Sequence, residues 1–252
     1  MNRPLALAAL LLSPLLVQAA EPLRIATDAT YPPFEYVDTA GKVAGFEVDF
    51  AYAVCKAMQT PCEVVNQPWD GLIPGLQAKK YDAIMSSMNI TDERRKVVAF
   101  SKVYYLMQNR FVARKGVALT PDLAGKVIAV QTGTPQDRFV TQQYKQATVK
   151  RYVNAQDPML ELTAGRADFT FGNTVQLQKG FLDTPNGKAF GFIGPLFDGR
   201  KDKVLGEGVA VALRKQDSAL KARFDQAIDQ VKQSGEYAAL LKKHNLAGLL
   251  ED

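Results

Sequence analysis

The 252-residue sequence has few of the residues and motifs on which enzyme active sites are commonly built. It has a single histidine, His244, in a lysine-rich stretch near the C-terminus. It has no GxSxG nucleophile elbow, no HExxH motif and no glycine-rich phosphate loop. A catalytic serine would need a base and an orienting group, and the sequence identifies neither. No catalytic residue, cofactor or metal site is therefore predicted, and only a pair of catalytic carboxylates stays open.

Cysteine is almost absent as well, since the chain has only Cys55 and Cys62. Two cysteines seven positions apart can close a short loop at a helix end if the protein is exported to an oxidising compartment. Two free buried thiols are the alternative. Metal binding is disfavoured, because no histidine lies near the pair and two ligands do not make a site.

The charge is not concentrated in any one part of the sequence. The formal net charge is +5, but Lys and Arg are scattered and form no stripe interleaved with aromatic residues. A nucleic-acid-binding protein would concentrate its basic residues in such a stripe. Nucleic acid is therefore not expected as a partner.

Long hydrophobic runs are missing except at the N-terminus. There, Arg3 precedes an apolar run from Leu5 to Val17, and Ala19 and Ala20 follow it. This pattern is typical of a secretory signal peptide, and the run is shorter than the about 20 residues that span a membrane. We expect residues 1–20 to be a signal peptide and the mature protein to be soluble and exported.

From residue 23 onward, short β-like runs alternate with helical patterns, and no long repeat is evident. The expected strands are 23–26, 62–65, 82–85, 125–130, 148–153, 168–171, 190–195 and 206–215. The expected helices are 46–58, 72–79, 135–144, 159–164, 218–232 and 237–243. The alternation predicts an α/β protein with parallel sheets covered by helices, and a second series that begins at residue 125 indicates two lobes.

Three polar stretches follow expected strands: 86–94, "QTGTPQ" (131–136) and "GNT" (172–174). In open α/β sheets, ligands bind beyond the carboxyl ends of the strands. Solvated turns between a strand and a capped helix would look similar. The first stretch favours a binding site, because Arg94, Ser86 and Ser87 supply the planar cation and the hydroxyl groups that bind a carboxylate.

Two further residues support a binding site, each with a structural alternative. Thr91 can cap the helix that follows it, and the N-terminus of that helix would favour an anion. Trp69, the only tryptophan, can stack on the aliphatic part of a ligand or pack beside a turn in the core.

Three segments carry a resemblance to a known family: "DATYPPFEYVDTAGKVAGFEVDFAYAVCKAM" (28–58), "WDGLIPGLQAKKYDAIMSSMNITDERRKVVAFS" (69–101) and "LTAGRADF" (162–169). They resemble the amino-acid-binding branch of the bacterial extracellular solute-binding proteins (family 3), above all the lysine/arginine/ornithine- and histidine-binding proteins. The resemblance covers essentially the whole mature chain.

The resemblance implies a two-lobed Venus-flytrap receptor of the periplasm that closes on its ligand and delivers it to an ABC permease. Each lobe would be a mostly parallel sheet flanked by helices, and two strands would form the hinge. Lobe 1 would comprise residues 21–108 and 207–252, and lobe 2 residues 109–206. A monomer without a cofactor is the default for this class.

The resemblance also assigns roles to individual residues. Arg94 would bind the α-carboxylate of the ligand, with Ser87 and the main chain around Asn89, Thr134 and Gln136 as further donors. Tyr31 and Trp69 would hold the aliphatic stem, Asp28 would face a cationic side chain, and Ser86 would contact the α-amino group or the side chain. Cys55 and Cys62 match the disulfide pair of the subgroup.

The chain departs from the family pattern at Asn173, where the lysine/arginine binders carry an Asp that binds the α-ammonium group. An amide supplies no counter-charge, and losing one partner of a buried ion pair costs about 2–5 kcal/mol. Either another acid compensates, such as Glu161 or Asp198, or the ligand lacks a plain α-ammonium group. Asn89 replaces a usual Ser, and Pro135 removes a main-chain donor beside the expected carboxylate site.

We therefore expect the substrate-binding component of an ABC transporter for arginine, lysine, ornithine or an arginine-derived compound. Opines such as octopine or nopaline, and other polar amino acids such as histidine, are alternative ligands. A periplasmic cyclohexadienyl dehydratase, an enzyme that resembles these receptors, is the remote alternative, and a sensor acting through a membrane partner is a third.

Overall fold

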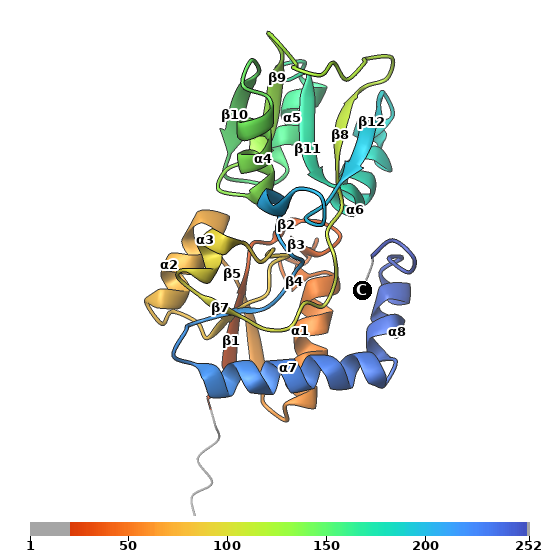
Figure 1. Cartoon of the computed structure of the whole chain (residues 1–252). Helices are drawn as coiled ribbons and strands as arrows, with labels where there is room; N and C mark the ends of the chain where they lie inside the picture. Colours follow the sequence, from red (N-terminus) through yellow and green to blue (C-terminus); the bar gives the residue numbers. More distant parts are fainter. Residues whose placement is uncertain (1–20, 251–252) are drawn as a thin grey trace, which may run out of the picture.

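The computed structural model describes residues 21–250, which form two lobes stacked one above the other (Figure 1). The predicted signal peptide, residues 1–20, lies outside the described residues. Each lobe contains a five-stranded sheet with helices beside it. Among residues 21–250, no helix is long and apolar enough to cross a membrane.

The sheet of the lower lobe has the spatial order β5 (Cys62–Asn66), β1 (Leu23–Thr27), β6 (Ala83–Ile84), β13 (Ala212–Leu213), β7 (Ala99–Phe100). β1 runs parallel to β5 and β6, whereas β13 runs antiparallel to β6 and β7. Since β1 and β6 are parallel, the segments after them meet at one edge of the sheet. There, the main-chain N–H of Asp28 donates to Ser86 Oγ at 2.9 Å.

The sheet of the upper lobe has the order β10 (Thr148–Tyr152), β9 (Val127–Gln131), β11 (Phe169–Asn173), β8 (Asn109–Arg114), β12 (Phe190–Phe197). β9 is parallel to β10 and β11, and β8 is antiparallel to β11 and β12. Its helices are α4 (Pro135–Gln143), α5 (Asp157–Thr163) and α6 (Thr174–Leu177), followed by a π-helical turn, Gln178–Leu182. β9 and β11 therefore direct the polar stretches after them toward the lower lobe (Figure 1).

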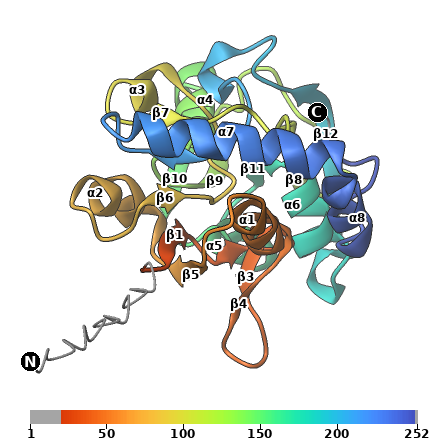
Figure 2. The ribbon, with the colours of Figure 1, turned by 90° about the horizontal axis from the view of Figure 1, so that it is seen from below.

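The helices of the lower lobe are α1 (Phe46–Ala57), α2 (Leu72–Gln77), α3 (Asp92–Arg95), α7 (Ser218–Gln233) and α8 (Glu236–Lys243). Phe46, Phe50 and Val54 are spaced four residues apart on α1, and all three are fully buried. Each such burial stabilises the fold by about 1.5–3 kcal/mol. Viewed from below, α7 lies across the lobe, close to α1 and α8 (Figure 2).

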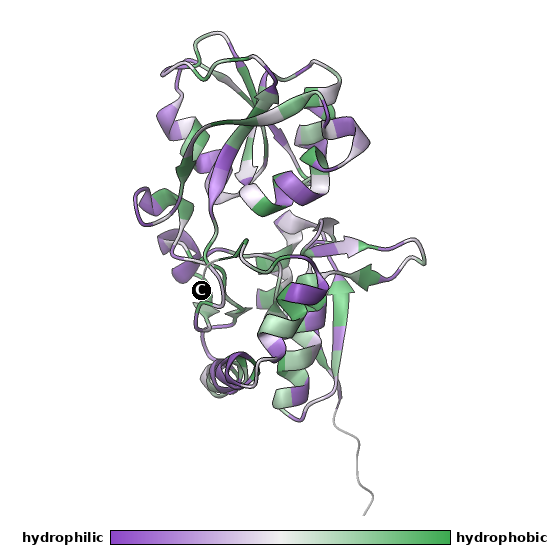
Figure 3. Cartoon of the chain, turned by 90° about the vertical axis from the view of Figure 1, so that its right-hand side faces the viewer, coloured by the Kyte–Doolittle hydropathy of each residue, from purple (hydrophilic) through white to green (hydrophobic). Residues whose placement is uncertain are grey.

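Hydrophobic residues follow the same layering. They gather in the strands and on parts of the helices, while hydrophilic residues occupy other parts of the helices and the loops (Figure 3).

The remaining short turns are the 3₁₀ segments Trp69–Gly71, Pro185–Gly187 and Lys203–Leu205.

A small antiparallel sheet, β2 (Thr30–Tyr31), β3 (Glu35–Val37) and β4 (Val43–Ala44), extends from the lower lobe. Its strands are too short to show a period in the sequence, and it was not predicted. Its register pairs Tyr31 with Glu35. This pairing brings Glu35 toward the space between the lobes.

Two chain segments connect the lobes, around Tyr105 and around Val209, and they pair with each other. Val209 also pairs with Asn89 of the lower lobe. These crossing segments support lobe boundaries at 108/109 and 206/207, which we retain as a proposal.

The predicted α/β alternation agrees with the structure at each expected helix and at seven of the eight expected strands. The exception is 206–215, where only Ala212–Leu213 is a strand. The earlier part of that segment pairs with Asn89 and Tyr105 through isolated bridges instead of entering a sheet. The predicted disulfide between Cys55 and Cys62 is present, with Cα atoms 6.2 Å apart.

Candidate functional site

A cavity of about 360 Å³ lies between the lobes and brings together residues far apart in the sequence. Nine of the ten predicted binding residues line it: Asp28, Tyr31, Trp69, Ser86, Ser87, Asn89, Arg94, Thr134 and Gln136. The tenth, Asn173, does not.

Arg94 supplies the positive charge of the cavity. It lies on α3, a helix that Thr91 caps by accepting from the Arg94 main-chain N–H at 3.3 Å. Its side chain donates to the carbonyls of Asn89 at 2.7 Å and Gly133 at 3.5 Å, and its guanidinium lies 5.1 Å from the ring centre of Trp69. Burial lowers the Arg94 pKa to about 10, with a further contribution from Arg138.

Arg94 is only 8% exposed, and no carboxylate among residues 21–250 lies within ion-pair distance of it. Buried charges in proteins are normally paired. The guanidinium is therefore a preorganised site for an anion that the protein itself does not supply.

The N-terminus of α4 forms the opposite wall. Thr134 caps this helix by accepting from the Asp137 N–H at 3.1 Å, and Pro135 follows as the first helical residue. The N–H at this first position would have no partner within the helix in any case, so proline removes little there. The main-chain N–H of Gln136 comes next and has no helical carbonyl to bind, which leaves it suited to a carboxylate.

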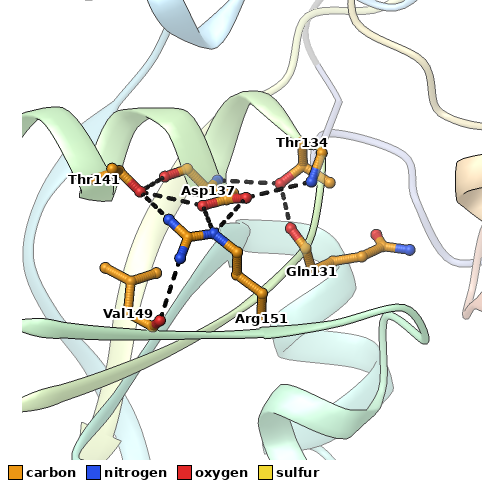
Figure 4. A network of polar contacts seen from close by, with 7 residues as sticks. Gln131, Thr134, Asp137, Thr141, Val149 and Arg151 are labelled. Carbon is orange, nitrogen blue, oxygen red and sulfur yellow. Dashed lines mark hydrogen bonds and ion pairs between the residues drawn. The ribbon is translucent and has the colours of Figure 1, made fainter.

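A hydrogen-bond network holds this wall in position (Figure 4). Arg151 on β10 donates to both carboxylate oxygens of Asp137, at 2.9 and 3.1 Å, and to Thr141 at 2.7 Å. Thr134 Oγ1 donates to the carbonyl of Gln131 at 2.8 Å. The end of β9 and the start of α4 are thereby fixed to each other.

Two carboxyl groups from the lower lobe line the same cavity. Asp28 follows β1 and accepts from Thr30 Oγ1 at 3.0 Å and from Gln131 Nε2 at 3.0 Å. Burial raises the pKa of Asp28, although both hydrogen bonds oppose this effect. Glu35 lies near enough that the charge on Asp28 also raises its pKa. Neither carboxyl group has a cationic partner among residues 21–250, so together they form a site for a cationic group.

Glu35 belongs to a buried acidic cluster beneath the cavity. Ser87 Oγ donates to Glu35 at 3.2 Å and accepts from Tyr105 at 3.0 Å, while Tyr104 donates to Glu47 at 2.7 Å. Burial, followed by the charge of Glu47, raises the pKa of Glu35 well above its usual value. Burial also raises the pKa of Glu47 to about 7.

Ser87 adopts a left-handed backbone conformation with a φ of 47°, which is costly for a residue other than glycine. This conformation places its hydroxyl between Glu35 and Tyr105. Ser86, its neighbour, accepts from the Asp28 main chain and so connects the ends of β6 and β1.

Asn89 is fixed by Nδ2, which donates to the Leu205 carbonyl at 3.0 Å, while its buried Oδ1 has no hydrogen-bond partner among the described residues. Gln136 Nε2 donates to Asn109 Oδ1 at 2.7 Å. Both amide groups also contact Met107 Sδ, at 3.4 Å from Asn89 and 3.3 Å from Gln136, so these two nearly buried side chains converge on one sulfur atom.

Tyr31 and Trp69, the two predicted aromatic residues, both line the cavity. Burial raises the pKa of the Tyr31 hydroxyl, which accepts a hydrogen bond from the main chain of Asn173 in the upper lobe. Tyr31 therefore bridges the lobes at the edge of the cavity.

Asn173 is 1% exposed and serves a local role. It caps α6, and its Oδ1 accepts from the Gln176 main-chain N–H at 2.9 Å. The cap requires a side-chain oxygen at this position, which the amide supplies. Direct contact of the Asn173 side chain with a ligand stays a prediction.

Four lining residues are not among the predicted binding residues: Glu35, Met107, Gln131 and Pro135. Gln131 had a usable signal, because it directly follows the predicted strand 125–130 and begins the polar stretch 131–136 in an α/β protein. Glu35 had none, because its position depends on the short β2–β3 pairing. Among residues 21–250, no group of three or more His, Cys, Asp or Glu side chains could hold a metal ion.

The sequence pattern of the bacterial extracellular solute-binding proteins, family 3, matches residues 23–247. The chain belongs to this family. The expected family membership and two-lobed fold are thereby confirmed.

Relatives of this family 3 protein cover nearly its full length. The L-arginine-binding protein of Pseudomonas aeruginosa is 41% identical over 90% of this chain and 88% of its own. The lysine/arginine/ornithine-binding periplasmic protein of Escherichia coli is 38% identical over 89% and 87%.

A solved structure shows the same similarity in three dimensions. A periplasmic binding protein of Salmonella typhimurium, described as having high arginine specificity, superposes with a TM-score of 0.82. It is 34% identical, and the match covers 89% of this chain and 99% of that one.

Proposed function

We propose that the protein is the substrate-binding component of an ABC transporter and captures a cationic amino acid, with arginine, lysine or ornithine as the candidate ligands. The names of its full-length relatives, an arginine-binding and a lysine/arginine/ornithine-binding protein, support this ligand class. The family and the N-terminal sequence support export to the periplasm. Two relatives of Escherichia coli that are named as ABC transporter arginine-binding proteins support transfer to a membrane permease.

The observation that carries the proposal is the separation of charges within one cavity. Among residues 21–250, Arg94 is buried without a carboxylate partner, and Asp28 and Glu35 have no cationic partner, although all three line the same cavity. A basic amino acid has a carboxylate at one end and a cation at the other, so it neutralises both groups at once. Tyr31 and Trp69 supply apolar surface for the methylene groups between these ends.

The two lobes contact each other in the structure, and these contacts indicate how closure around a ligand would work. Gln131 of the upper lobe donates to Asp28, and Arg94 of the lower lobe donates to Gly133 at 3.5 Å. An ion pair between Arg138 and Glu93 joins the lobes at the surface. A ligand bound first to the lower lobe would add the Gln136 main chain and the start of α4 to its contacts as the lobes close.

Binding without turnover is the second part of the proposal. The test is a thermal-shift series on protein that has been unfolded, stripped of ligand and refolded. We expect arginine, lysine or ornithine to raise the midpoint, and histidine, agmatine and neutral amino acids to raise it less. If none of the basic amino acids raises the midpoint, the ligand class is wrong. Conversion of prephenate by the same preparation would contradict a purely binding role.

A further inference from the structure

A second cavity, of about 370 Å³, adjoins the first on the side of the upper lobe. It lies among α5, the end of β11 and α6. The two cavities share four lining residues, Tyr31, Gln131, Thr134 and Gln136. The two cavities therefore adjoin each other at these four side chains.

All residues of the described chain that line the second cavity are uncharged. Pro158, Met159 and Leu177 make part of it apolar, and Thr170 and Gln176 supply polar groups. Transfer of an unpaired charge into such a space is strongly unfavourable. The cavity therefore selects against an ammonium or carboxylate group and accepts an uncharged one.

Gln176 has hydrogen-bonding capacity that the protein hardly uses. The residue is 3% exposed, and the only hydrogen-bond contact of its side chain within residues 21–250 is with Met159 Sδ at 3.9 Å. Thr170, which is 2% exposed, lines the same cavity. Buried amides are normally satisfied, so Gln176 points to a ligand that carries a carbonyl or an amide.

The shared residues indicate which part of the ligand reaches the second cavity. Thr134 and Gln136 stand at the start of α4, where the ligand carboxylate is expected, and the α-nitrogen is attached to the adjacent carbon. Asp28 and Glu35 line only the first cavity, and the Asn173 amide is used as a helix cap. A charged α-ammonium directed toward the second cavity would find no carboxylate there.

We propose that the second cavity binds an uncharged acyl group on the α-nitrogen of the ligand, so that Nα-acylated basic amino acids are preferred. Acylation turns the α-ammonium into a neutral amide and supplies a carbonyl that can accept from Gln176 or Thr170. This inference rests on the proposed function, because the first cavity must hold the carboxylate and the cationic side chain.

The test is calorimetric titration of ligand-stripped protein with L-arginine, Nα-acetyl-L-arginine and Nα-(1-carboxyethyl)-L-arginine. We expect the acetyl compound to bind at least tenfold more tightly than arginine, and the carboxyethyl compound more weakly than the acetyl one because its substituent is charged. Gln176→Leu should abolish the advantage of the acetyl compound and leave arginine affinity within twofold. Gln142→Leu, at an exposed position of α4, is the control. It should change neither the affinity for arginine nor the affinity for the acetyl compound.

Thr170→Val is a second variant, in which valine has nearly the shape of threonine but lacks the hydroxyl. It should also reduce the advantage of the acetyl compound over arginine. Equal or weaker binding of the acetyl compound, with arginine still bound, would overturn this inference and leave the proposed function intact. If none of the three compounds binds, the proposed function fails and this inference fails with it.

Discussion

Gln131 Nε2 of the upper lobe donates a hydrogen bond of 3.0 Å to Asp28 Oδ2 of the lower lobe. Gln131 ends β9 and Asp28 follows β1, so the bond joins the carboxyl ends of two strands across the cavity. Thr30 donates to the other oxygen of the same carboxylate. Asp28 is thus held in place as an acceptor, and the lobes meet through residues expected to bind the ligand.

Asp28→Asn should weaken arginine binding at least 30-fold and change the affinity for citrulline, which lacks the cationic group, by less than threefold. Loss of one partner of a buried ion pair costs about 2–5 kcal/mol. Calorimetric titrations with both ligands measure this difference. Glu63→Gln removes an exposed carboxylate on β5 and serves as the control. Unchanged arginine affinity in Asp28→Asn would refute the role of Asp28 as the cation partner.

Arg94→Ala should reduce the affinity for every ligand that has an α-carboxylate by at least 100-fold, because Arg94 is the one buried cation that lines the cavity within residues 21–250. The neighbouring Arg95 pairs with Glu207 at the surface, and exposed pairs contribute only about 0–1 kcal/mol. Arg95→Ala is therefore the matched control and should bind normally. Thermal unfolding should show that both variants fold. Tight arginine binding by Arg94→Ala would place the carboxylate elsewhere.

Gly180→Ala should weaken ligand binding without weakening the fold. Gly180 lies in the upper lobe, and a Cβ there would come within 2.9 Å of the Pro32 carbonyl of the lower lobe. The substitution therefore opposes close contact of the lobes, while alanine is the better residue in a helical turn by up to about 1 kcal/mol. Calorimetry should show lower affinity, and small-angle scattering should show a larger radius for the ligand-bound protein. A wild-type affinity and a wild-type radius would show that closure does not require Gly180 to lie this close to the Pro32 carbonyl.

The ligand-free protein should lose stability as the pH rises from about 4.5 toward about 7. Burial raises the pKa of Glu47 from 4.5 to about 7, so the folded state binds more protons than the unfolded state across this window. The loss should level off above about pH 7, and Glu35, whose pKa is also raised by burial, acts in the same direction.

Glu47→Gln tests this origin of the pH dependence. Chemical denaturation between pH 4.5 and 8 should give a flatter stability profile for the variant, because glutamine does not ionise. The Glu63→Gln variant should keep the wild-type slope. An equally steep slope in Glu47→Gln would assign the dependence to other groups.

The fold could be predicted largely because its elements are long and periodic. The four-residue spacing of Phe46, Phe50 and Val54 predicts the helix that packs them, and "VIAV" predicts a buried strand. The β2–β4 sheet could not be predicted, because two- and three-residue strands are stabilised by tertiary pairing and leave no periodic pattern.

The candidate site, like the fold, could be predicted only in part. Residues at the ends of predicted strands, such as Ser86 and Thr134, could each be placed at the carboxyl edge of a sheet from topology, and the family resemblance brought the two edges into one site. Glu35 could not, because it enters the cavity through the register that pairs it with Tyr31. Asn173 was read as part of the site, and its cap on α6 depends on a short helix that the sequence did not reveal.

The most direct test of the account is calorimetric titration of ligand-stripped protein with L-arginine, citrulline and agmatine. Citrulline keeps the carboxylate and lacks the cation, whereas agmatine keeps the cation and lacks the carboxylate. A cavity with Arg94 on one side and Asp28 and Glu35 on the other predicts one-to-one binding of arginine, at least 30-fold tighter than either analogue. Equal affinities for the three compounds, or no binding of arginine, would contradict the account.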